Sequence, residues 1–193
     1  MSTLNINSQE EKQVKEKAQK FLLWLAIGSI VMLFAAFTSA YIVRKGDGNW
    51  NELNLPSTFY YSTFFILISS ITMNWALSSA KKNDQKNLTN ALVLTFVFGL
   101  AFVFFQFSSW SHLISNNIYF SGGNASGSYL YVLSGLHLVH LFGGMIGLSV
   151  VLIKSFLKKY SSENYHGIQL CAIYWHFLDF LWIYLFLFLL LIR

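Results

Sequence analysis

Charged residues are scarce in this sequence of 193 residues, because Asp, Glu, Lys and Arg together make up only 11% of it. A soluble domain of ordinary composition has about a quarter. The chain also has a single cysteine, Cys171, which excludes a disulfide bond or a cysteine-based cluster within it. Its one proline, Pro56, stands just before an apolar segment and would rigidify the entry to a helix there. These scarcities argue against a soluble globular domain.

The chain is instead rich in apolar residues, since 55% of it is hydrophobic and 18% is aromatic. They gather in five long segments: 21–43, 59–80, 88–110, 129–153 and 170–192. Each is longer than the roughly 20 residues that a helix needs to cross about 30 Å of hydrocarbon. Backbone groups cannot stay unpaired in lipid, so the segments are predicted to be helices. The predicted fold class is all-α, a polytopic membrane bundle of five transmembrane helices.

The basic residues are distributed by side of the membrane, which is how orientation is set. Ten would lie on one side and three on the other: Lys12, Lys15, Lys17, Lys20, Lys81, Lys82, Lys86, Lys154, Lys158 and Lys159, against Arg44, Lys45 and Arg193. This predicts a cytoplasmic N-terminus and an external C-terminus. The net charge of +5 therefore gives no indication of nucleic-acid binding. Residues 1–20 are predicted to form a cytoplasmic helical arm, and 21–193 the five-helix transmembrane domain.

Asp179 is the only Asp, Glu, Lys or Arg inside the five segments. A charge at bilayer depth is costly unless it faces protein and finds a partner. His176 and Asp179 are three residues apart, as are His137 and His140, so each pair shares one helix face. A rise of 1.5 Å per residue places His140 and Asp179 at nearly the same depth. The four residues are therefore predicted to form a structural polar clamp, with Asp179 bonded to His140 or otherwise to polar groups near His176.

Two other interpretations of these residues remain open. Imidazoles on facing helices are what a bis-histidine haem requires, and His140 and His176 would be its ligands. A histidine and a carboxylate at bilayer depth could also relay protons. The residue types favour the clamp without excluding either alternative.

Basic and aromatic residues near the helix ends, together with Trp182 near mid-depth, predict bound phospholipid, with headgroups held by charge and acyl chains by packing. The residues that carry this prediction are Arg44, Lys45, Trp75, Trp110 and Trp182, with Lys154, Lys158 and Lys159 at the other interface. Small residues four apart allow helices to approach closely. Such pairs are Ala36 with Ala40, and Gly143 with Gly147.

The apolar segments also carry motifs that resemble subunit III of the haem-copper respiratory oxidases, the cytochrome c oxidase family and its quinol-oxidising relatives. The last segment matches the family's Tyr-Trp-His-Phe-Val-Asp-x-x-Trp run through Tyr174, Trp175, His176, Phe177, Leu178, Asp179 and Trp182. The segment before it matches Gly-x-His-x-x-His, followed by glycine, through Gly135, His137, His140 and Gly143. The resemblance covers all five segments and indicates the five-helix form of the family. Ile30 and Ser109 stand where the family has acidic residues.

The resemblance implies a non-catalytic accessory subunit of a proton-pumping cytochrome c oxidase in the bacterial cytoplasmic membrane. Such a subunit has no redox centre of its own, so haem and copper are expected in partner subunits. The resemblance also implies packing against catalytic subunit I, with subunit II in the same complex, and phospholipid held between the helices. A quinol oxidase subunit III is the alternative within the family. The alternative from a different class is a stand-alone haem-binding membrane protein that uses His140 and His176.

Overall fold

Five long α-helices account for most of the chain in the computed structural model, which describes residues 2–46, 48, 50, 55–120, 125–162 and 164–192. The helices are α1 (Ser2–Gly46), α2 (Thr58–Lys81), α3 (Gln85–Ser115), α4 (Ala125–Phe156) and α5 (His166–Leu191). All five are long and apolar enough to cross a membrane. The prediction of an all-helical chain with five spans is confirmed.

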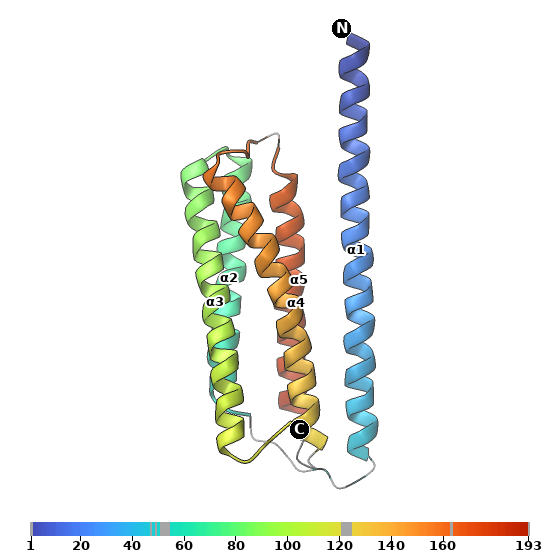
Figure 1. Ribbon diagram of the computed structural model, residues 1–193, viewed down its shortest axis with the longest axis vertical. Coiled ribbons are helices and arrows are strands. Elements are labelled where there is room, and N and C mark those ends of the chain that lie inside the picture. The colour runs from blue at the N-terminus through green and yellow to red at the C-terminus, as the bar shows by residue number, and fades with distance from the viewer. Residues whose placement is uncertain are drawn as a thin grey trace.

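Helices α2, α3, α4 and α5 form a four-helix bundle, and α1 packs on its outside (Figure 1). Each bundle helix contacts the next one along the chain, and α5 also contacts α2, which closes the ring. The N- and C-termini lie at opposite ends of the molecule. We call the end with the α2–α3 turn and the α4–α5 connection the lysine-rich end. The end with the C-terminus is the opposite end.

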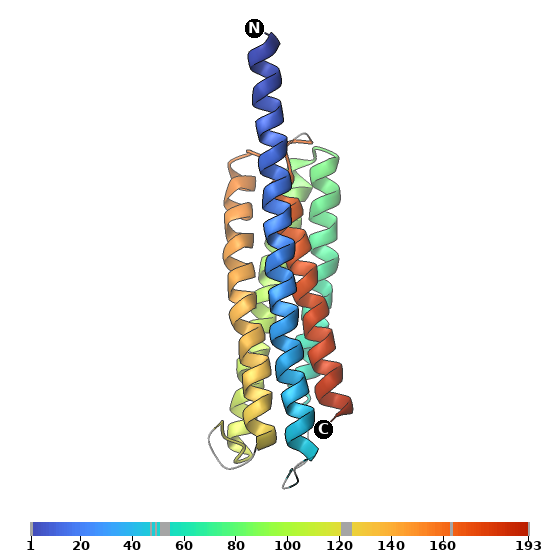
Figure 2. The ribbon, with the colours of Figure 1, turned by 90° about the vertical axis from the view of Figure 1, so that its right-hand side faces the viewer.

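Helix α1 contacts the bundle along one narrow stripe on α4 and α5. Its buried residues are Ile27, Ile30, Phe34, Thr38 and Tyr41, spaced three or four apart as on one face of a helix. The helix spans 45 residues without a break, and its N-terminal part extends beyond the other four helices (Figure 2). The predicted arm and the first predicted span are therefore one continuous helix.

The helix ends at the lysine-rich end are held by local hydrogen bonds. Asn83 takes the left-handed conformation (φ 57°) that ends α2, and Asp84 caps α3 by accepting from the backbone N–H of Asn87 at 3.1 Å. At the opposite end Lys45 Nζ donates to the carbonyl oxygen of Ile192 at 3.1 Å. These contacts fix α2 beside α3, and the end of α1 beside the end of α5.

Two glycines, Gly99 of α3 and Gly144 of α4, make close helix contacts. A Cβ atom on Gly99 would lie 2.9 Å from Met145 Sδ and 3.0 Å from the Trp175 ring, so only glycine fits there without a shift. Gly144 likewise abuts Leu178. The predicted pairs Ala36 with Ala40 and Gly143 with Gly147 are exposed instead, which corrects that prediction. Spacing shows that two residues share a face, but it does not show which way the face turns.

Candidate functional site

A row of polar contacts runs between α2 and α5, and we call it the polar seam. It joins Thr63, Ser69 and Ser70 of α2 to Trp175, His176 and Trp182 of α5. The indole N–H of Trp182 donates to Thr63 Oγ1, and that of Trp175 donates to Ser69 Oγ, each at 3.0 Å. Each bond pairs a buried indole N–H that would otherwise lack an acceptor. The seam therefore couples the two helices over about two turns of α5.

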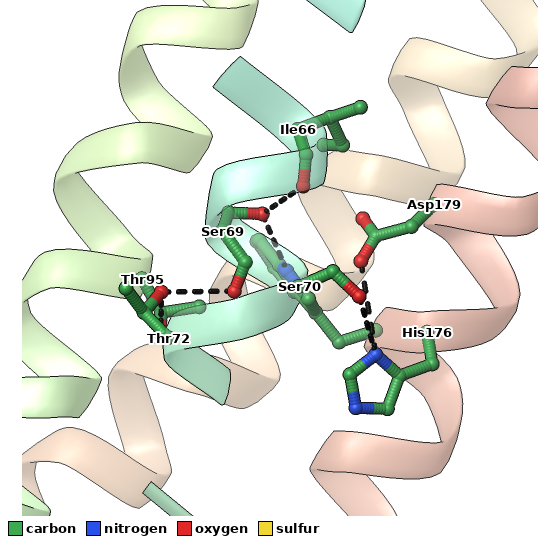
Figure 3. Close-up of polar contacts among 8 residues, drawn as sticks. Ile66, Ser69, Ser70, Thr72, Thr95, His176 and Asp179 are labelled. Carbon is green, nitrogen blue, oxygen red and sulfur yellow. Dashed lines mark hydrogen bonds and ion pairs between the residues drawn. The ribbon is translucent and has the colours of Figure 1, made fainter. Parts of the chain in front are cut away.

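Asp179 lies beside Ser70 and His176 of the seam (Figure 3). Ser70 Oγ and His176 Nδ1 are hydrogen-bonded at 2.8 Å, and one oxygen of Asp179 lies 3.9 Å from the same nitrogen. The Asp179 side chain points into this cluster, and the residue is only 3% exposed. The buried carboxyl group thus faces a hydroxyl and an imidazole on the α2 side of α5.

His140, the more favoured of the predicted partners of Asp179, lies elsewhere. Its Nδ1 donates to the carbonyl oxygen of Leu136 at 2.7 Å, and its ring packs against Phe34 of α1 with centroids 5.8 Å apart. Among the described residues the ion-pair contact of Asp179 is with His176. The expected bond from Asp179 to His140 is therefore wrong. Asp179 lies instead near His176, the second expected location, and neither of its carboxyl oxygens has a hydrogen-bond partner in the described part of the chain. The cause is the rotation of α5 about its own axis. Because α5 packs against α2 as well as α4, the face that carries Asp179 is turned toward α2.

His137 occupies a third environment, fully buried among aromatic rings. Its ring centroid lies 5.0 Å from that of Trp182 and 5.8 Å from that of Phe102. Neither ring nitrogen has a hydrogen-bond partner in the described part of the chain. The four residues of the predicted clamp thus face three different surroundings. His140 packs against α1, His176 and Asp179 face α2, and His137 lies in the bundle core. His140 and His176, the pair proposed for haem ligation, contact different helices.

Ser70 and Thr95 are polar contacts that the sequence analysis missed. Thr95 of α3 is hydrogen-bonded to Thr72 of α2 at 2.8 Å, so α2 has polar contacts on both sides. The available signal was the number of hydroxyl residues in the apolar segment 59–80, which includes Ser62, Thr63, Ser69, Ser70 and Thr72. Hydroxyl side chains in membrane helices commonly bond across to a neighbouring helix.

The residues predicted to bind lipid differ widely in exposure. Trp182 is 1% exposed and lies inside the bundle, so its prediction as a lipid contact is wrong. Trp110 is half-buried and donates to Ser134 Oγ at 3.1 Å, while Trp75 is 43% exposed on the outer face of α2. Arg44 and Lys45 are half-buried where α1 ends. Position along each segment indicated depth for these residues, but not whether they face protein or the bilayer.

A cavity of about 510 Å³ lies between α1 and the α4–α5 connection at the lysine-rich end, and we call it the basic cavity. Its polar lining is Lys12, Lys15, Glu16, Gln19, Lys154, Lys159, Tyr160, Asn164 and His166. Burial raises the pKa of Tyr160 to about 12, so its phenol stays neutral at physiological pH. Four lysines and one glutamate leave the lining with a net positive charge, which suits an anion.

A second cavity of about 300 Å³ lies between α1 and α5, and we call it the apolar groove. It is lined by Val31, Phe34, Ala35, Phe177, Phe180, Leu181 and Tyr184. From Gln19 in the basic cavity to Val31 in the groove, α1 rises roughly 18 Å. That rise is close to the roughly 15 Å half-thickness of a bilayer core. The basic cavity lies where α1 meets α4 and the α4–α5 connection, and the apolar groove lies where α1 meets α5.

Comparison with known proteins gives the family of this chain. The family model described as cytochrome c oxidase subunit III matches residues 46–192. Cytochrome c oxidase subunit 3 of Alkalihalophilus pseudofirmus is 29% identical over 184 residues, covering 93% of this chain and 89% of the relative.

Two other relatives are equally similar. The probable cytochrome c oxidase subunit 3 of Nocardia farcinica is 31% identical and covers 86% of this chain and 82% of the relative. Subunit 3 of the cytochrome bo(3) ubiquinol oxidase of Buchnera aphidicola is 30% identical and covers 96% and 92%. The chain therefore belongs to the cytochrome c oxidase subunit III family, and it is a subunit III of a haem-copper oxidase.

Proposed function

We propose that this chain is a non-catalytic accessory subunit, which packs against the catalytic subunit I beside subunit II and binds phospholipid. The observation that carries the proposal is that the motif residues of α4 and α5 are used in contacts between helices. His137, Trp175 and Trp182 are buried in contacts between helices, and His176 and Asp179 face Ser70 across the polar seam. Such residues stabilise a bundle. Haem and copper are assigned to the partner subunits.

The proposed location is the bacterial cytoplasmic membrane, with the lysine-rich end in the cytoplasm. The positive-inside distribution of ten against three basic residues supports this orientation. In this orientation the basic cavity would lie at the cytoplasmic interface, where anionic headgroups attract lysine side chains.

Cytochrome c is the proposed electron donor, with quinol as the alternative. The relatives from Alkalihalophilus and Nocardia have names that denote cytochrome c oxidases, and the Buchnera relative belongs to a ubiquinol oxidase. A tag on this chain allows the intact complex to be purified. Its rate of oxidation of reduced cytochrome c against that of ubiquinol then decides between the two donors.

The phospholipid is proposed to lie along α1, with its headgroup in the basic cavity and an acyl chain in the apolar groove. Lys154 and Lys159 from α4 and the following loop face Lys12 and Lys15 from α1 across the basic cavity. Phe34, Phe177 and Phe180 supply flat apolar surface in the groove. A lipid here would also fill the space beside the narrow contact between α1 and the bundle.

The double substitution Lys154→Ala with Lys159→Ala is expected to remove about one anionic phospholipid per complex, because it halves the lysine charge of the basic cavity. Native mass spectrometry of the purified complex measures the bound lipid. Lys81→Ala with Lys82→Ala is the matched control, since both of these lysines are exposed at the same end and neither lines the cavity. Equal lipid retention by the two double variants would contradict the proposed site.

A further inference from the structure

A second cationic cavity lies on another side of α4, between the lysine-rich ends of α3 and α4. It has a volume of about 330 Å³ and is lined by Gln85, Lys86, Thr89, Ser155, Phe156 and Lys158. It shares none of these residues with the basic cavity. We propose that this cavity binds the phosphate of an anionic phospholipid between Lys86 and Lys158. The inference rests on the proposed membrane orientation and adds a lipid site on the side of α4 away from α1.

Two hydrogen bonds hold together the helix ends that carry the two lysines. The Gln85 side chain donates to the carbonyl oxygen of Tyr160, which ties the loop after α4 to the first turn of α3. One turn further along α3, Thr89 Oγ1 and Ser155 Oγ are hydrogen-bonded at 2.8 Å. These two bonds join α3 to α4 and its loop beside the cavity, so Lys86 and Lys158 extend from helix ends whose relative position is fixed.

Lys158 stands at a position that usually favours glycine. Its φ of 51° is left-handed, its N–H donates to Ser155 O at 2.9 Å, and the next N–H donates to Lys154 O at 3.1 Å. This is the Schellman arrangement that ends many helices, and the left-handed residue in it is most often glycine. Lysine costs about 1 kcal/mol more than glycine in such a conformation. A side chain kept there despite that cost points to a use for its charge.

The charges of the site match one phosphodiester. In the described part of the chain neither Lys86 nor Lys158 forms an ion pair. The carboxylate that acts on Lys86 is Asp84, whose oxygens accept from the backbone N–H of Asn87 at 3.1 Å and from its side chain at 2.6 Å. These Asn87 hydrogen bonds hold the pKa of Asp84 below its usual value, so it is ionised. Two positive charges and one negative leave +1, which one phosphodiester neutralises.

Apolar exposure beside the cavity identifies a lipid as the source of that phosphate. Phe156 lines the cavity and is 61% exposed, and Ile153, one turn closer to the membrane centre on α4, is 59% exposed. A free phosphate ion gains nothing from these side chains. An acyl chain attached to the bound headgroup would cover them, which provides both polar and apolar contacts at one interface.

The test uses the whole oxidase complex in nanodiscs of phosphatidylcholine doped with phosphatidylglycerol. Native mass spectrometry counts the phosphatidylglycerol molecules that stay bound. Lys86→Ala with Lys158→Ala is expected to retain about one fewer than the parent complex, while Lys81→Ala with Lys82→Ala, which removes the same charge nearby, retains the parent number. Retention equal to the parent in the Lys86 and Lys158 variant would overturn the inference, as would equal loss in the control.

Two further arms separate this site from its alternatives. Addition of inorganic phosphate is expected to leave the bound phosphatidylglycerol in place, and displacement of the lipid would assign the site to free phosphate instead. Lys154→Ala with Lys159→Ala reports on the basic cavity alone. A loss of lipid in that variant, without any loss in the Lys86 and Lys158 variant, contradicts the second site and leaves the proposed function intact.

Discussion

Replacement of Trp182 by alanine is expected to cause the largest loss of stability among single substitutions in this chain. The indole stacks on Phe59 at 6.0 Å and meets Phe102 edge-on at 4.9 Å and His137 at 5.0 Å. It also donates to Thr63. One side chain thus joins α5 to each of the other three bundle helices. Trp→Ala in a packed core costs about 3–5 kcal/mol through lost contacts and the cavity left behind.

Thermal dissociation of the subunit from the purified complex measures this effect. Trp182→Phe keeps an aromatic ring and loses the bond to Thr63, so its cost should be about 1 kcal/mol. Trp75→Ala is the matched control, because Trp75 lies on the outer face of α2 and is expected to be nearly neutral. If Trp182→Ala and Trp75→Ala released the subunit at the same temperature, Trp182 would not be the centre of the core.

The second large effect is expected at the polar seam, where Ser70, His176 and Asp179 should act as one unit. Asp179→Ala removes a buried carboxyl group from this cluster, and Ser70→Ala removes the 2.8 Å bond to His176. Ser70→Ala should weaken retention of the subunit, because it leaves His176 Nδ1 without its hydrogen-bond partner at a cost of about 1–3 kcal/mol. Asp179→Ala should weaken it by removing the buried side chain that contacts His176 at 3.9 Å. The double variant should lose less than the sum, with a coupling of about 0.5–3 kcal/mol.

A second double-mutant cycle, Asp179→Ala with His140→Ala, is the control for that coupling. His140 packs against Phe34 and bonds within its own helix, so its effect should add to that of Asp179. Coupling in the His140 cycle and additivity in the Ser70 cycle would restore the original pairing of α4 with α5. The initial electron-transfer rate of assembled complexes should stay unchanged in every variant. A rate abolished by Asp179→Ala would require a proton relay in place of the structural role.

The helices could be predicted from sequence because the bilayer imposes a strong constraint on length and polarity. The predicted segment 59–80 corresponds to α2 (Thr58–Lys81) in the structure, and the predicted segment 170–192 corresponds to α5 (His166–Leu191). The helices extend beyond several apolar segments, since polar residues such as Gln85 and Lys86 continue a helix outside the hydrocarbon. The arm preceding residue 21 joined α1 for the same reason.

The partners of individual side chains could not be predicted in the same way. Spacing and rise gave Asp179 and His140 a similar depth, but they contained no information on the rotation of α5 about its axis. That rotation directs Asp179 toward Ser70 and buries Trp182. Both features of α5 follow from the arrangement of the four bundle helices, in which α5 packs against α2 as well as against α4. A contact between helices so far apart in the chain depends on tertiary packing and leaves no local pattern.

Purification through a tag on this chain in mild detergent tests the accessory-subunit account most directly. The measurement is the optical spectrum and subunit composition of the eluted material, together with its oxidation of reduced cytochrome c. The account predicts elution with a large catalytic subunit that carries the haem and retains oxidase activity. A stable monomer without oxidase partners would contradict it, as would a haem spectrum retained by this chain alone.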